Sequence, residues 1–160
     1  MAKQSINKTN AARLLDRAKI AYELIPYEVD ENDLAATHVA ESLGEPIERQ
    51  GDLPGAARRL AQQYGVSVLL KAGHLVGDEL IDIFYNYETG EVAELSARRV
   101  DTPNTHGTGC PLSSAFAAHL AKGLPLTEAA RAAKAYINNA IIYGAAYKIG
   151  NGHGPVCHFY

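Results

Sequence analysis

This sequence of 160 residues has little cysteine, no long apolar run and no large excess of one charge. Its two cysteines, Cys110 and Cys157, lie far apart and lack the spacing of metal ligands, so we expect neither a disulfide framework nor a zinc site. Free thiols are the expected state. His158 follows Cys157 directly, but two adjacent ligands without two further partners make a poor metal site. A fixed cysteine-based metal site is therefore not predicted.

Long apolar segments are also missing. No stretch approaches the roughly 18 apolar residues of a membrane span, and the opening MAKQSINKTN lacks the apolar region of a secretory signal. We therefore expect a cytoplasmic protein with no membrane partner. The net charge of −3 argues against a surface devoted to nucleic-acid phosphates. With 47% apolar and 21% charged residues, the composition is typical of one globular domain, or of one domain and a fragment.

Residues 8–44 predict a helix, a strand and a second helix. Thr9 or Asn10 can cap the first helix, whose apolar positions recur at helical spacing up to Ala18. Residues 20–29 favour an edge strand, because Pro26 cannot donate a hydrogen bond to a neighbouring strand. Residues 37–44 favour a helix that ends at a glycine.

A domain boundary is predicted near Gly51, where three glycines and two prolines fall within residues 44–55. It divides the chain into residues 1–50 and residues 51–160. The second part alternates helical and strand-like patterns, which indicates an α/β fold. Its expected elements are a helix over 54–65, a strand buried on both faces of a parallel sheet over 66–74, a hairpin over 80–100 that turns at Gly90, and helices over 111–121 and 127–143.

The most informative motif is NTHGTGC, residues 104–110. Gly107 and Gly109 allow successive N–H groups to point into one concavity, and a helix that starts directly afterwards adds its positive dipole end. Such a loop suits a phosphate or a developing oxyanion. The same dipole would stabilise the thiolate of Cys110. The spacing alone leaves a second interpretation open, in which GTG is only a turn between a strand and a helix.

Three segments together resemble the C-terminal portion of the hydroxymethylpyrimidine (phosphate) kinases, ribokinase-like enzymes of thiamine synthesis that are related to pyridoxal kinases. The segments are VLLKAGHLVGDELIDIFY, ARRVDTPNTHGTGCPLSSAFAAHLAKGLPLTEAARAAKAYI and GNGHGPVCHF, and the resemblance covers about residues 52–160. It implies a partial ribokinase-like αβα layered sheet with a β-hairpin, preceded by a small helix–strand–helix segment. It also implies ATP with Mg²⁺ as cofactors and a small pyrimidine phosphate as the acceptor of the phosphoryl group.

The resemblance also implies site residues. Gly107, Thr108, Gly109 and Cys110 match the anion hole, whose N–H groups stabilise the transferring phosphoryl group, and Cys110 matches the base that activates the acceptor. Lys71 matches the lysine of the family's KGGH motif, which approaches the nucleotide phosphates. Without the resemblance, the favoured interpretation of Lys71 is a lysine at a strand end whose charge reaches solvent.

The sequence departs from the family motifs at two positions. Ala72 stands where the family usually has a glycine, and Pro111 stands where it has threonine or serine, although Ser113 and Ser114 keep hydroxyl groups in the first turn. Nearby glycines would allow His74 and His106 to line the site, or they could equally be polar loop residues, and we assign neither a chemical role.

Residues 6–48 resemble a different family, the N-terminus of YbaK-type prolyl-tRNA deacylases. The sequence leaves that pattern at about Arg49, before the lysine that those enzymes need. Three hypotheses follow: an ATP-dependent kinase, an aminoacyl-tRNA deacylase, and a non-catalytic chimera in which the glycine loop is only a turn.

The kinase resemblance places the acceptor pocket in an N-terminal half that this chain replaces with residues 1–50. A parallel sheet interrupted in this way would expose an apolar edge, which the N-terminal segment or a second copy in a homo-oligomer would have to cover.

Overall fold

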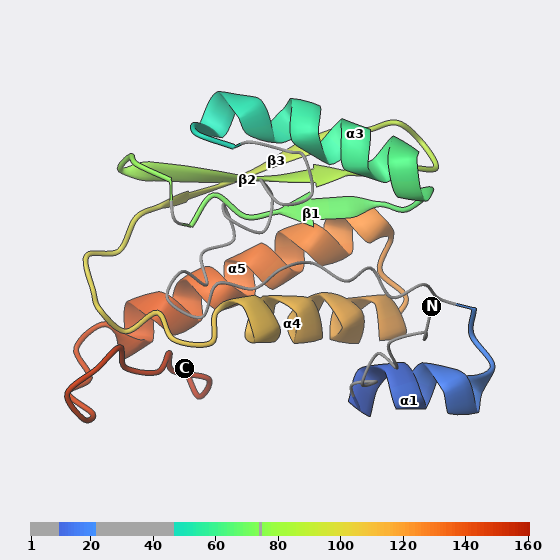
Figure 1. Cartoon of the computed structure of the whole chain (residues 1–160). Coiled ribbons are helices and arrows are strands. Elements are labelled where there is room, and N and C mark those ends of the chain that lie inside the picture. The colour runs from blue at the N-terminus through green and yellow to red at the C-terminus, as the bar shows by residue number, and fades with distance from the viewer. Residues whose placement is uncertain (1–9, 22–46, 74) are drawn as a thin grey trace, which may run out of the picture.

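The computed structural model describes residues 10–21, 47–73 and 75–160. Figure 1 shows a layered arrangement, with α3 on one side of a small sheet and α4 and α5 on the other. The elements in chain order are α1 (Asn10–Ala18), the short 3-10 helix η1 (Gln50–Asp52), α3 (Leu53–Tyr64), β1 (Val68–Leu70), β2 (Glu79–Tyr85), β3 (Val92–Arg98), α4 (Gly109–Ala121) and α5 (Leu126–Gly144). The predicted α/β class, a partial layered sheet with a hairpin, is confirmed.

The three strands pair in the order β1–β2–β3, and both pairs are antiparallel. The prediction of a parallel sheet is therefore wrong for the described strands. The connections, residues 71–78 and 86–91, are both shorter than the dozen or so residues that a parallel crossover needs. An apolar run cannot reveal this, since it looks the same in either orientation. β1 is also half-buried rather than buried on both faces, because it lies at an edge of this sheet.

Side chains of β2 alternate between the two layers of helices. Ile83 and Tyr85 pack with the buried face of α3, which includes Leu53 and Ala57. Phe84 faces the other way and belongs to a cluster with residues of β3 and α5. Its ring meets Phe116 of α4 edge-on, with ring centres 5.9 Å apart. This alternation also turns Asp82 toward the α4 and α5 side of the sheet, because Asp82 and Phe84 share a face.

One side chain covers part of the sheet edge. β1 pairs with β2 only from Ile83 to Tyr85, so the start of β2 has no strand partner on that side among the described residues. Gln50 takes this place. Its side-chain amide donates to the carbonyl of Glu79 at 2.8 Å, and its oxygen accepts the N–H of Ile81 at 2.7 Å. The amide therefore reproduces the hydrogen bonds of a neighbouring strand.

The predicted helices of the second part are found with small shifts at their ends. α3 ends at Gly65, which adopts the left-handed conformation with φ 66°, and Gly90 turns the hairpin with φ 72°. α1 confirms the first predicted helix. The strand predicted over 20–29 and the helix over 37–44 fall almost wholly outside the described residues.

Candidate functional site

The loop before α4 carries the predicted glycine motif. Gly107 has φ 81°, a conformation that a residue with a Cβ rarely adopts. Thr108 follows as the N-cap of α4 in a helical conformation, and its side chain makes no capping hydrogen bond. The helix begins at Gly109, two residues before the predicted start at Pro111. Gly109 and Cys110 therefore belong to its first turn.

The start of α4 presents free backbone donors. The first helical hydrogen bond runs from the N–H of Leu112 to the carbonyl of Thr108, at 3.2 Å. Pro111 has no N–H to satisfy. The N–H groups of Gly109 and Cys110 donate no hydrogen bond within the described part of the chain. Such unpaired donors at the positive end of a helix dipole are suited to an anion.

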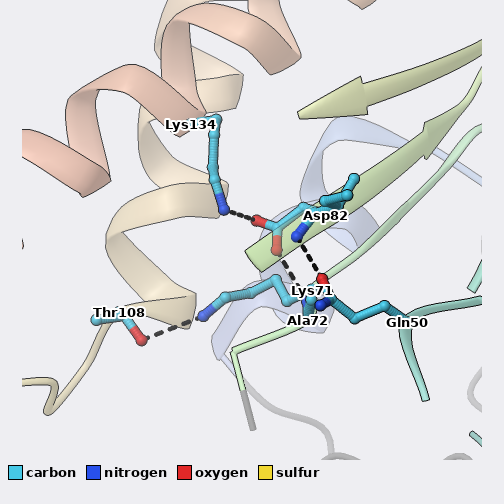
Figure 2. A network of polar contacts seen from close by, with 7 residues as sticks. Gln50, Lys71, Ala72, Asp82, Thr108 and Lys134 are labelled. Atoms are coloured by element: carbon cyan, nitrogen blue, oxygen red, sulfur yellow. Dashed lines mark hydrogen bonds and ion pairs between the residues drawn. The ribbon is translucent and has the colours of Figure 1, made fainter. Parts of the chain in front are cut away.

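Lys71 reaches this loop from the end of β1. Its Nζ donates to Oγ1 of Thr108 at 3.1 Å, which joins two predicted site residues 37 positions apart in the chain (Figure 2). Partial loss of hydration lowers the pKa of Lys71, and the nearby charge of Lys134 lowers it further, whereas Asp82 and Cys110 act in the opposite direction. Lys71 is therefore directed to the loop and is not only a solvated lysine at a strand end.

A buried carboxylate lies behind Lys71. Asp82 is 2% exposed, and its Oδ2 lies 2.7 Å from Nζ of Lys134 on α5. Its Oδ1 accepts the N–H of Ala72, the residue after Lys71, at 2.8 Å (Figure 2). One carboxylate thus stands near two ammonium groups. Together, Asp82, Lys71 and Lys134 keep a surplus positive charge beside the unpaired N–H groups of α4.

A second buried side chain fixes the glycine loop. Asn104 is 3% exposed, and its amide donates to the carbonyls of Gly144 at 2.9 Å and Tyr147 at 2.8 Å, just beyond α5. The loop is also held by the C-terminal tail, residues 150–160, because the N–H of His106 donates to the carbonyl of Gly154 at 3.1 Å. The loop that precedes α4 is therefore anchored to the end of α5 and to the tail.

The two cysteines have different surroundings. Cys110 is a free, exposed thiol in the first turn of α4, and Cys157 is a free, buried thiol in the tail. The hydroxyl of Ser113 donates to the carbonyl of Gly109, one helical turn earlier, at 3.1 Å. His106 is exposed, and His74 lies outside the described residues.

Sequence reasoning missed Asp82, Lys134 and Asn104. Asn104 stands within the motif that carries the resemblance, so its place there was the available signal. Asp82 interrupts an apolar strand, which is a second signal, because a charge on a buried face needs a partner. Nothing in the sequence identified Lys134 as that partner.

No group of three or more His, Cys, Asp or Glu that could hold a metal ion occurs among residues 10–21, 47–73 and 75–160. In the same ranges, no helix is both long enough and apolar enough to cross a bilayer.

Solved structures with a similar fold include pyridoxal kinases, which are ribokinase-like. The pyridoxal kinase of Staphylococcus aureus, solved in complex with ADP, matches with a TM-score of 0.68 and 27% identity, over 76% of this chain and 44% of that chain. A hydroxymethylpyrimidine/phosphomethylpyrimidine kinase of Rhizobium meliloti is 52% identical over 94 residues, which are 59% of this chain and 35% of the relative. A thiamine biosynthesis bifunctional protein ThiED of Geobacter sulfurreducens is 42% identical over 115 residues, 72% of this chain and 23% of the relative.

The family model for phosphomethylpyrimidine kinase matches residues 35–157. The chain belongs to this family. The match spans less than half the length of each of these three relatives. The family match begins before Gly51, and the division into residues 1–50 and 51–160 stays a prediction. The deacylase resemblance of residues 6–48 also stays a prediction, since most of that segment lies outside the described residues.

Proposed function

We propose that this chain is the phosphate-binding portion of a phosphomethylpyrimidine kinase and that it binds ATP, with Mg²⁺, at Lys71 and the Gly107–Cys110 loop. The observation that carries the proposal is the hydrogen bond of 3.1 Å between Lys71 and Thr108. It joins the two motifs of the resemblance at a helix start with unpaired N–H groups. The pyridoxal kinase relative solved with ADP supports a nucleotide as the ligand.

Each residue has a role in this proposal. Lys71 binds a terminal phosphate, and its surplus charge offsets the charge of that phosphate. The N–H groups of Gly109 and Cys110 are placed to stabilise charge that develops on the transferring phosphoryl group. The thiol of Cys110, exposed beside these donors, is placed to accept the proton of the acceptor as a thiolate. Mg²⁺, when bound with the nucleotide, supplies further charge neutralisation.

The acceptor by resemblance is hydroxymethylpyrimidine phosphate, the substrate class in the names of the family's relatives. Phosphoryl transfer depends strongly on positioning of both substrates. A chain that spans about a third of that relative would therefore bind nucleotide more readily than it transfers phosphate. Binding and transfer must for this reason be measured separately.

Calorimetric titration with Mg-ATP tests the binding step. We expect the parent chain to bind and Lys71→Met to bind at least about tenfold more weakly, because one charged contact to phosphate is lost. Lys122→Met is the matched control, since Lys122 is exposed at the other end of α4 and its loss should leave the affinity unchanged. Absence of binding by the folded parent chain would refute the proposal.

Transfer is tested with labelled ATP and hydroxymethylpyrimidine phosphate. Product formation that disappears in Cys110→Ala would support a complete kinase site in this chain. Binding without product would restrict the function to nucleotide binding, with transfer requiring a second polypeptide that supplies the acceptor pocket.

A further inference from the structure

Asp82 forms a buried pair with Lys134 and accepts the N–H of Ala72, the residue after Lys71 (Figure 2). Neither Asp82 nor Lys134 reaches the Gly107–Cys110 loop. We propose that Asp82 is a positioning residue for Lys71. Its carboxylate fixes the backbone beside Lys71 through the N–H of Ala72, and its negative charge acts on the ammonium groups of both Lys71 and Lys134. This inference rests on the proposed function, because the purpose of positioning Lys71 is to meet a phosphate.

Geometry gives the first argument. The Asp82 carboxylate accepts the N–H of Ala72 at 2.8 Å, so the peptide unit that follows Lys71 is tied to β2. Ala72 itself is fully buried. The backbone before Lys71 is fixed in β1, and the backbone after it is held by Asp82. The side chain of Lys71 therefore leaves the strand in one direction, toward Thr108.

Charge gives the second argument. An ion pair as buried as Asp82 and Lys134, with side chains 3% and 12% exposed, is rarely favourable for stability compared with apolar residues. A role for the charges is therefore needed to explain the pair. Asp82 raises the pKa of Lys71 and Lys134 lowers it, so the two buried charges bias the protonation of Lys71 in opposite directions.

The experiment measures the protonation of Lys71 without any nucleotide. The amine of Lys71 is labelled with trace amounts of acetic anhydride over a series of pH values, and its peptide is quantified by mass spectrometry against that of exposed Lys122. Only the neutral amine reacts, so the pH profile reports the pKa of Lys71. The charged groups that act on Lys71 are Asp82 from β2, Lys134 from α5 and Cys110 from α4.

Asp82→Asn keeps an oxygen for the Ala72 N–H and removes the negative charge. We expect the profile of Lys71 to move to lower pH, with about threefold higher reactivity at about pH 8. Lys134→Met should move the profile to higher pH, with reactivity lowered by a similar factor. Lys134→Arg restores the charge and should restore the parent profile.

Opposite shifts in the two variants support the proposal, because they show that the charges of Asp82 and Lys134 both act on the ammonium of Lys71. Unchanged profiles, or shifts in the same direction, would overturn it. If Asp82→Asn does not fold, the comparison of Lys134→Met with Lys134→Arg still tests whether the buried pair acts on Lys71, and an unchanged profile in Lys134→Met would overturn the proposal. Glu128→Gln and Arg131→Met are the matched controls. They remove the same charges from an exposed pair on α5, at 3.8 Å, and should move nothing.

Mg-ATP titrations over the same pH range separate this inference from the proposed function. Binding should weaken as pH rises through the pKa of Lys71, at lower pH in Asp82→Asn and at higher pH in Lys134→Met. Opposite labelling shifts without any nucleotide binding would leave the positioning of Lys71 intact and refute the nucleotide site. Nucleotide binding with unmoved labelling profiles would support the nucleotide site and refute the positioning of Lys71 by Asp82.

Discussion

The loop that leads into α4 and the loop that follows Lys71 are held by different kinds of groups. Asn104, a buried neutral amide, donates to carbonyls at the end of α5. The loop Leu75–Asp78 is held by Arg99, an exposed side chain whose Nε donates to the carbonyl of Gly77 at 2.7 Å and whose Nη2 donates to that of Leu75.

Water can replace an exposed donor but not a buried one. Loss of a buried donor leaves its acceptors without partners, whereas acceptors near the surface can turn to solvent. The loop before α4 therefore contributes to the stability of the whole fold. The Leu75–Asp78 loop should be able to open by itself.

The largest effect on stability is expected at Gly154, where the tail packs against Asn104. A Cβ at Gly154 would overlap Oδ1 of Asn104 and lie 2.8 Å from its Cγ. Asn104 cannot move aside without breaking its own hydrogen bonds. Gly154→Ala should therefore lower the free energy of unfolding by about 3 kcal/mol, measured by urea denaturation.

Gly152→Ala is the control for this change, because a Cβ there meets nothing within 4 Å. The cause is tested by repeating Gly154→Ala in an Asn104→Ala background. The overlap is then gone, so the second change should cost less than about 1 kcal/mol. Equal costs in both backgrounds would show that the tail is not held against Asn104.

The loop before α4 shows which features of the fold could be predicted from the sequence. The presence of a helix at the end of NTHGTGC and the hairpin turn at Gly90 follow from local signals, because glycines and helical periodicity act over a few residues. The partners of Asn104 lie 40 and 43 positions away, and no local pattern specifies them. Motif residues could therefore be predicted, while the groups that hold them could not.

The candidate site shows the same division. Lys71 and the Gly107–Cys110 loop were predicted through a resemblance, and the structure brings Lys71 to Thr108. Asp82 and Lys134 were missed, because a charge within an apolar strand indicates that a partner exists but not which helix supplies it. The direction of β1 was mispredicted since apolar content carries no information about strand orientation.

A smaller effect is expected at the second loop. Arg99→Ala should lower the free energy of unfolding by no more than about 1 kcal/mol, because Arg99 is exposed and the backbone bond from Arg99 to Asp78 remains. Amide exchange in Leu75–Asp78 should nevertheless accelerate by about tenfold, since the loop opens locally. Arg98→Ala, at the exposed neighbouring arginine, should change neither quantity. A global loss as large as that of Gly154→Ala would remove the distinction between the loops.

The smallest effect on stability is expected at Cys110, which lies in the α4 loop region but points to solvent. Cys110→Ser should leave the free energy of unfolding within about 0.5 kcal/mol of the parent, because an exposed side chain there supports no packing.

The reactivity of the Cys110 thiol is a separate prediction. Iodoacetamide at neutral pH should modify Cys110 well before Cys157, because Cys110 is exposed beside the unpaired N–H groups of α4 and Cys157 is buried. Peptide mapping of the folded protein measures both rates, and denaturant should make them equal. Equal rates in the folded chain would mean that the tail opens as readily as the helix start, and would contradict the anchoring of the tail to the α4 loop.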